Sequence, residues 1–130
     1  MDRLSAVLDA WALIAFLRDE PAADRVRQAM EAGAAASWVN LGEVLYVEAR
    51  RQGERRAEEA VEALAVFLDA RPAERDAARR AGLVKARGGL SYADCFAVAT
   101  AEELELPLLT GDPEIVGLQR AGLQIEDLRR

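Results

Sequence analysis

Short apolar runs alternate with longer stretches of helical periodicity along this chain, and this alternation limits the fold more than any other feature. A connection between parallel strands has to cross the sheet, and a helix usually makes that crossing. The pattern therefore predicts an α/β fold, a three-layer α/β/α sandwich with a mostly parallel central sheet of about four to five strands. There is no internal repeat or linker, so residues 1–130 are expected to form a single domain.

The expected strands are short and apolar, and the expected helices carry apolar residues three or four positions apart. The strands are predicted at residues 6–8, 34–39, 106–109 and 123–128. The helices are predicted at residues 11–17, 22–31, 41–51, 55–68, 72–85 and 91–104, with a short one at Pro113. The aromatic residues Trp38, Tyr46 and Phe67 are expected in the core, with an interface between chains as the alternative.

The chain contains no histidine and one cysteine. The usual general base, the usual zinc ligand and any nucleophile activated by histidine are therefore excluded. Cys95 cannot form an internal disulfide and is expected to pack as a small apolar group. Chemistry in this chain has to use carboxylates.

No apolar run approaches the roughly 20 residues that a membrane-spanning helix needs, so a membrane span is not expected. The first residues lack the basic start and the cleavage site of a secretory signal. A cytoplasmic location is therefore expected.

Acidic residues stand at positions where apolar ones would be expected. Asp9, Glu43 and Asp94 each interrupt an apolar segment with no lysine or arginine beside them. Burying an ionised carboxylate without a partner costs several kcal/mol or more, so such a group needs a proton or a cation. Asp9 and Asp112 follow the two clearest strands, while Glu43 and Asp94 are expected in the first turn of their helices.

The carboxyl ends of parallel strands are where ligand sites form in open sheets, so the four acids are expected at one edge. A cluster of carboxylate oxygens is an environment that Mg²⁺ or Mn²⁺ prefers. Helix capping is the competing interpretation, because Asn40 with Glu43 and Ser91 with Asp94 fit capping boxes. Caps and metal ligands are compatible, and the four acids taken together favour a metal site.

The segments that carry these acids resemble the motifs of PIN domains, and within them the VapC toxins of toxin–antitoxin pairs. Residues 7–13 are similar to the first-strand acid motif, and residues 40–44 to the helix-borne glutamate motif. Residues 90–97 and 108–112 resemble the third and fourth motifs, and the resemblance covers the whole chain. Trp11 departs from the pattern, because many members carry a small hydroxyl residue there.

The resemblance implies a Mg²⁺- or Mn²⁺-dependent endoribonuclease that hydrolyses RNA phosphodiester bonds. Asp9, Glu43, Asp94 and Asp112 would then be the catalytic and metal-binding residues, with Thr110 in a supporting role. It also implies two protein partners, a cognate antitoxin that blocks the site and a second copy of the chain in a homodimer.

The net charge of −6 argues against nonspecific binding to nucleic acid over the whole surface but allows a local basic groove. Six basic residues lie close together between positions 71 and 87, against two acidic ones. A solvated helix face with internal ion pairs is the alternative interpretation. The candidate RNA contacts are Arg75, Arg79, Arg80, Lys85 and Arg87.

Two other functions are compatible with these features. A Mg²⁺-binding receiver-like signalling module has a similar size and acids at strand ends, but it would need paired acids after the first strand and a lysine after a late strand. The acid at Asp9 has no acidic neighbour, and Lys85 lies in a predicted helix. The second alternative is a PIN-fold binding module with little cleavage activity.

Overall fold

The sheet at the centre of the molecule is entirely parallel in the computed structural model, which describes residues 3–129. Its strands lie side by side in the order β3-β2-β1-β4-β5, and all four neighbouring pairs are parallel. The strands are β1 (Ala6–Leu8), β2 (Ala34–Ser37), β3 (Asp69–Arg71), β4 (Leu108–Thr110) and β5 (Ile125–Asp127). The predicted fold class is confirmed.

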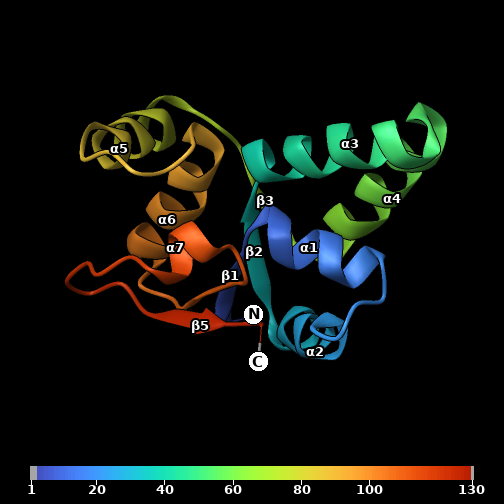
Figure 1. Ribbon diagram of the computed structural model, residues 1–130, viewed down its shortest axis with the longest axis horizontal. Coiled ribbons are helices and arrows are strands. Elements are labelled where there is room, and N and C mark those ends of the chain that lie inside the picture. Colours follow the sequence, from blue (N-terminus) through green and yellow to red (C-terminus); the bar gives the residue numbers. More distant parts are fainter. Residues whose placement is uncertain (1–2, 130) are drawn as a thin grey trace.

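Helices cover both faces of this sheet, which gives three layers (Figure 1). One side carries α1 (Ala10–Leu17), α2 (Ala23–Ala32), α3 (Trp38–Gln52) and α4 (Glu54–Val66). The other carries α5 (Arg75–Ala86), α6 (Tyr92–Leu104) and α7 (Pro113–Val116). No described helix is both long enough and apolar enough to cross a membrane.

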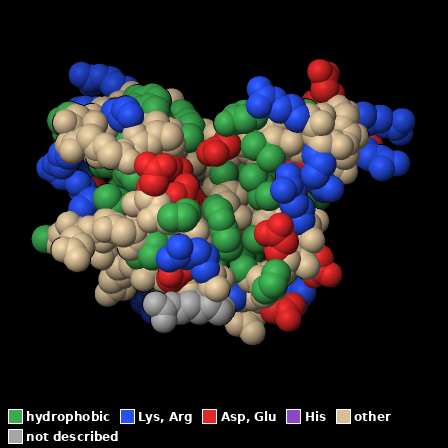
Figure 2. All heavy atoms as spheres, viewed as in Figure 1, with side chains coloured by type: hydrophobic (Ala, Val, Ile, Leu, Met, Phe, Trp, Pro, Cys, Tyr) green, Lys and Arg blue, Asp and Glu red, His purple; other side chains and the backbone are tan. Residues whose placement is uncertain are grey.

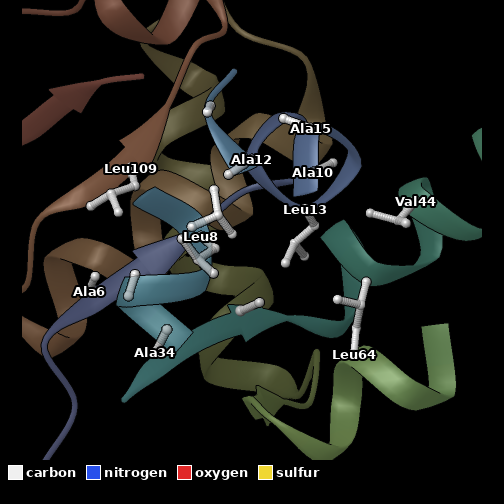
Figure 3. Close-up of a cluster of buried hydrophobic side chains, with 14 of the residues drawn as sticks. Ala6, Leu8, Ala10, Ala12, Leu13, Ala15, Ala34, Val44, Leu64 and Leu109 are labelled. Carbon is white, nitrogen blue, oxygen red and sulfur yellow. The ribbon is translucent and has the colours of Figure 1, made fainter. Parts of the chain in front are cut away.

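Two cores form because successive residues of a buried strand point to opposite faces of the sheet. In β1, Ala6 and Leu8 pack against α1 and its neighbours, whereas Val7 belongs to the core beneath α6. Figure 3 shows the first of these cores, in which Leu8, Leu13 and Leu109 lie close together. Cys95 is fully buried in the second core, as expected from its role as a small apolar group.

The strand β3 was not predicted, because Asp69–Arg71 has no apolar run. Its residues are exposed or half-buried at the edge of the sheet, where pairing with β2 places Ala70 beside Ala36. An edge strand of this kind is specified by its neighbour and not by its own hydrophobic pattern.

The helix α3 begins at Trp38, three residues earlier than predicted, and the preceding strand is correspondingly shorter. The hydroxyl of Ser37 accepts a hydrogen bond from the Val39 amide at 3.1 Å and so caps this helix. The competing interpretation, a capping box between Asn40 and Glu43, is therefore excluded, and the predicted placement of Glu43 in the first turn is wrong. The helix predicted at 72–85, by contrast, begins later than predicted, at Arg75.

The aromatic residues expected in the core are on the surface. The exposed fractions are 39% for Trp38, 51% for Tyr46 and 70% for Phe67. The buried core consists mainly of aliphatic side chains, many of them alanines, together with Phe96. The prediction of a core role for these three residues is wrong.

The chain order places a switch point between β1 and β4. From β1 the chain adds β2 and then β3 on one side, and afterwards crosses to add β4 on the other side of β1. Open α/β sheets bind ligands at the carboxyl ends of the strands where this reversal occurs. Asp9 follows β1 and Asp112 lies just beyond β4, so both acids stand at this point.

Candidate active site

Asp9 is the most buried acid at the switch point, with 1% of its surface exposed. Its Oδ1 accepts a hydrogen bond from the Ala12 amide at 2.9 Å, which makes Asp9 the N-cap of α1. Its Oδ2 accepts a hydrogen bond from the Thr110 hydroxyl. Both carboxylate oxygens are thus oriented by the protein.

Thr110 connects the two strand ends. Leu8 and Leu109 are register partners in the parallel pair of β1 and β4, so the residues that follow them are brought together. The fully buried Thr110 hydroxyl donates to Asp9 and accepts a hydrogen bond from the Asp112 amide at 3.0 Å. Asp112 in turn caps α7, because its Oδ1 accepts a hydrogen bond from the Glu114 amide at 2.9 Å.

Asp94 and Glu43 approach the same place from two helices. Asp94 lies in the first turn of α6, where its amide donates to the Ser91 hydroxyl at 3.2 Å, and it is buried. Glu43 lies on α3, and its Oε1 is buried without a hydrogen-bond partner. The Asn40 amide nitrogen donates to the Ala93 carbonyl at 3.0 Å, which ties α3 to the start of α6.

Burial and mutual repulsion raise the pKa of three of these acids. Burial raises the pKa of Asp9 to about 7, partly offset by the Thr110 and Ala12 hydrogen bonds, and the charge of Asp94 contributes further. Burial, with the charges of Asp112 and Glu43, raises the pKa of Asp94 to about 6. Burial and the charge of Asp112 also raise the pKa of Glu43. The four carboxylates therefore share one electrostatic environment.

Carboxylates that repel one another in a water-poor site are stabilised by a cation. Within residues 3–129, no three acids already stand in an arrangement that holds an ion, so these carboxylates are neighbours without forming a complete coordination shell. The donor set fits a hard divalent ion, because it consists of oxygens only and includes the unpartnered Glu43 Oε1. Figure 2 shows acidic side chains gathered around the hollow in the middle of the molecule, between the α5–α6 side and the α3 side.

Trp11 lies directly against the loop that carries Asp112. A Cβ atom on Gly111 would overlap the Trp11 ring, so the indole occupies the space that a side chain at Gly111 would need. Trp11 is half-buried and is the second residue of α1, two positions after Asp9. The departure from the family motif at Trp11 is therefore accommodated by the glycine opposite it.

α5 packs on α6 through apolar residues such as Ala81 and Val84, and the basic residues on α5 and at its end are exposed or half-buried. Arg79 and Arg80 both pair with Asp76, at 3.1 and 2.7 Å. The Lys85 ammonium donates to the Leu90 carbonyl at 2.6 Å, which places it near the N-terminal end of α6. Arg75 and Arg87 are exposed and form no ion pair with residues 3–129.

Known proteins that are similar to this chain include ribonucleases. The family model described as PIN domain matches residues 6–121. Ribonuclease VapC30 from Mycobacterium tuberculosis is 35% identical over 113 residues, which cover 79% of this chain and 86% of that protein. Ribonuclease VapC from Mycolicibacterium smegmatis is 34% identical over 113 residues, with 79% and 88% covered.

Solved structures show the same fold. The VapBC complex from Salmonella typhimurium bound to DNA matches with a TM-score of 0.75 at 20% identity, over 97% of this chain and 99% of that chain. The Mycobacterium tuberculosis toxin VapC20, described as cleaving the sarcin–ricin loop, matches with a TM-score of 0.68 at 17% identity, over 88% and 97%.

This chain belongs to the PIN-domain family, in the branch that contains the VapC ribonucleases. The match covers all four acids discussed above, since Asp9 and Asp112 both lie within residues 6–121. The receiver-like alternative is therefore wrong, because the whole motif-bearing region matches a different family.

One polar residue next to the acids was not recognised from the sequence as part of the site. Asn40 entered only as a capping partner of Glu43, and Ser37 occupies that capping position instead. The signal that could have found it is its spacing, because residues three apart on a helix share a face. Asn40 therefore lies on the Glu43 side of α3 and reaches α6.

Proposed function

We propose that Asp9, Glu43, Asp94 and Asp112 form the catalytic and metal-binding centre of a Mg²⁺- or Mn²⁺-dependent endoribonuclease. The observation that supports this most strongly is the mutual electrostatic influence of carboxylates from β1, α3, α6 and the end of β4, with pKa values raised by burial. Such a group is costly in a folded protein unless it serves to bind a cation.

Each acid has a task that follows from its surroundings. Asp9 is held by two hydrogen bonds, so it provides a fixed oxygen at the base of the site. The pKa of Asp94 is raised to about 6, so this group can accept a proton near neutral pH when no cation is present, and burial with the charge of Asp112 also raises the pKa of Glu43. A divalent cation, when bound, activates water and offsets negative charge on the scissile phosphate.

We propose that the substrate is RNA and that positive charge beside the acids guides its backbone. Phosphate contacts made by arginine and lysine supply most of the affinity of such complexes. Lys85 lies near the start of α6, where Asp94 stands, because its ammonium donates to the Leu90 carbonyl. Arg87 ends α5 and borders the same pocket as Arg79, Arg80 and Glu102. Arg75, Arg79 and Arg80 lie in the N-terminal half of α5, farther along this helix from Lys85.

We propose a cognate antitoxin and a second copy of this chain as protein partners. The curated relatives are VapC ribonucleases, and similar folds occur in structures described as VapBC toxin–antitoxin complexes. Large apolar side chains on the surface are available for contacts with protein partners. They include Trp38, Tyr46, Val66, Phe67, Leu83 and Tyr92. An RNA-cleaving toxin of this kind would act in the cytoplasm.

Cleavage of a mixed pool of single-stranded RNA with Mn²⁺ or Mg²⁺ tests the proposed activity. Asp94→Asn should lower the rate about 100-fold or more, and a chelator should abolish cleavage. Asp24→Asn is the matched control, because Asp24 is an exposed acid on α2 that pairs with Arg27. Cleavage that survives both chelator and Asp94→Asn would reject the mechanism. RNA binding without cleavage by the wild type would favour the binding-module alternative.

A further inference from the structure

Asn40 is completely buried between α3 and α6, although its side chain is polar. Its Nδ2 donates to the carbonyl of Ala93, the residue immediately before Asp94, at 3.0 Å. A carbonyl can only accept a hydrogen bond, so this contact fixes which end of the amide is the nitrogen. The Oδ1 atom is therefore on the other branch of the amide and cannot share that contact.

Among residues 3–129, the buried side-chain atoms that lack a hydrogen-bond partner are Asn40 Oδ1 and Glu43 Oε1. Both atoms are acceptors, and their residues are three apart on α3, so they lie on one face of this helix. An unsatisfied buried polar group costs about 1–3 kcal/mol. The charge of Asp112 already acts on Glu43, and Asn40 contacts the residue next to Asp94. A ligand that satisfies these two acceptors should therefore bring positive charge, because an anion would add to the repulsion.

The residue type at this position has a physical reason. An amide oxygen is a good ligand for hard cations, and it carries no formal charge. It therefore adds an oxygen to the site without adding to the repulsion that already raises the pKa of Asp94 and Glu43. A purely structural link between α3 and α6 would account for Nδ2 and would leave Oδ1 unexplained.

We propose that Asn40 is a fifth oxygen donor of this metal site, held in place by its hydrogen bond to Ala93. The proposal rests on the metal centre proposed above and adds to it a neutral member. Asn40 has two separable parts in this arrangement, a donor that ties α3 to α6 and an acceptor that serves the cation.

Calorimetric titration of the metal-free protein with Mn²⁺ tests the proposal without relying on activity. Asn40→Leu removes both the amide donor and the oxygen acceptor. Asn40→Ser keeps a polar side chain, but it is too short to reach either the Ala93 carbonyl or the cation. The Mn²⁺ affinity of each variant should therefore fall about 10- to 100-fold. Asn40→Asp keeps an oxygen and loses the donor. It should therefore bind Mn²⁺ at least as tightly as the wild type, while the metal-free protein melts at a lower temperature.

Thr100→Val is the matched control, because the buried Thr100 hydroxyl donates to the Phe96 carbonyl at 2.7 Å within α6. It removes one buried hydrogen bond and should leave Mn²⁺ affinity unchanged. Wild-type affinity in Asn40→Ser, or weakened binding in Asn40→Asp, would show that Asn40 is only a structural link. A wild-type protein that binds no Mn²⁺ would reject both this proposal and the metal centre. If the wild type binds Mn²⁺ and cleaves RNA, and Asn40→Ser binds Mn²⁺ with the same affinity as the wild type, only the role of Asn40 is rejected and the metal centre stands.

Discussion

Asp9 combines almost complete burial with two hydrogen bonds that hold its carboxylate in one orientation. Burial raises its pKa to about 7, whereas the ordinary value is 3.8. Between these values the folded protein retains a proton that the unfolded chain releases. Protonation of Asp9 therefore contributes to the free energy of unfolding at low pH, and this contribution is lost as the pH rises towards 7.

We therefore predict that the metal-free protein becomes less stable as the pH rises from about 5 to about 8, by a few kcal/mol in its free energy of unfolding. Asp94 acts in the same direction, because its pKa is raised to about 6. The chain has no histidine, so no ordinary imidazole titrates in this window. Urea unfolding in the presence of chelator measures the effect. Asp9→Asn should flatten the profile, and a wild-type profile that rises with pH would contradict the prediction.

The contact between Trp11 and Gly111 gives a second prediction at the scale of single residues. Gly111 does not have a positive φ, so its backbone accepts other residues, and the Trp11 ring is what excludes a methyl group. Gly111→Ala should lower the free energy of unfolding by about 1–3 kcal/mol in the wild type. After Trp11→Ala the same change should cost less than about 0.5 kcal/mol, as measured in a double-mutant cycle. Equal costs in the two backgrounds would show that the indole is not responsible.

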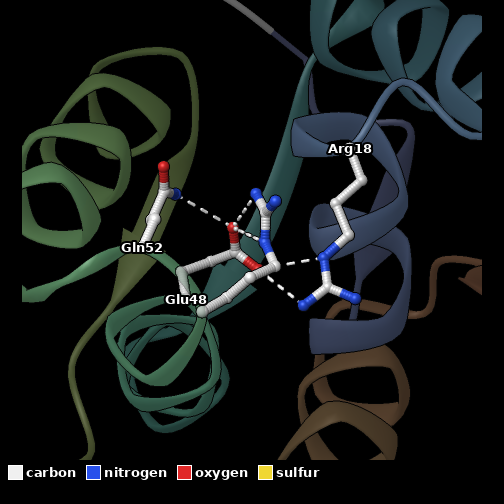
Figure 4. Close-up of polar contacts among 4 residues, drawn as sticks. Arg18, Glu48 and Gln52 are labelled. Carbon is white, nitrogen blue, oxygen red and sulfur yellow. Dashed lines mark hydrogen bonds and ion pairs between the residues drawn. The ribbon is translucent and has the colours of Figure 1, made fainter.

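The helices α1 and α3 are joined by a buried acid that the proposed site does not use. Glu48 is fully buried and accepts hydrogen bonds from Arg18, Arg51 and Gln52 (Figure 4). Burial alone would raise the pKa of Glu48, but the hydrogen bonds and charges of Arg51 and Arg18 outweigh it and lower the pKa. This cluster fixes α3, and with it Glu43, against the end of α1.

We predict an asymmetry between the two sides of this cluster. Arg18→Met combined with Arg51→Met leaves a buried carboxylate without its cations and should cost about 3–5 kcal/mol in the free energy of unfolding. Glu48→Gln leaves only guanidinium groups that reach solvent, since the exposed fractions of the Arg18 and Arg51 side chains are 32% and 47%. It should cost about 1–2 kcal/mol. Urea unfolding at neutral pH measures both, and a larger loss for Glu48→Gln would contradict the argument.

At the scale of the whole molecule, Figure 2 shows acidic side chains beside the notch between the two halves of this face, and basic side chains on the upper parts of both halves. Along α6, Asp94 stands at one end and Glu102 at the other, about 12 Å apart along the helix axis. Arg80 lies at the Glu102 end, because the charge of Glu102 acts on it. RNA that contacts both ends would have to follow the length of this helix.

We predict that Arg79→Ala combined with Arg80→Ala weakens RNA binding and flattens its salt dependence, by about 0.7 in the log–log slope for each lost phosphate contact. Binding is best measured in the Asp94→Asn background over a salt series, so that cleavage does not interfere. Arg55→Ala with Arg56→Ala is the control, because these exposed residues lie on α4, on the other side of the molecule (Figure 1). An unchanged slope for the α5 variant would remove Arg79 and Arg80 from the RNA surface.

Much of the fold could be predicted because hydrophobic periodicity is a local property of the chain. The strands that bury both faces, such as β1 and β4, are continuous apolar runs, and the capping roles of Asp9 and Asp112 depend on residues within three positions. The edge strand β3 was missed because its pairing depends on β2. The start of α3 was misplaced because a capping box and a single serine cap compete within a few residues.

The sequence by itself determined the layer order and the four acids that interrupt apolar segments, because burial patterns and charge placement can be read along the chain. Only the tertiary structure decided which groups meet across it: Thr110 with Asp9, Asn40 with Ala93, and Trp11 with Gly111. Each of these contacts joins residues far apart in sequence, and their distance depends on how the helices pack on the sheet. No local pattern specifies that packing, because many arrangements bury the same apolar faces.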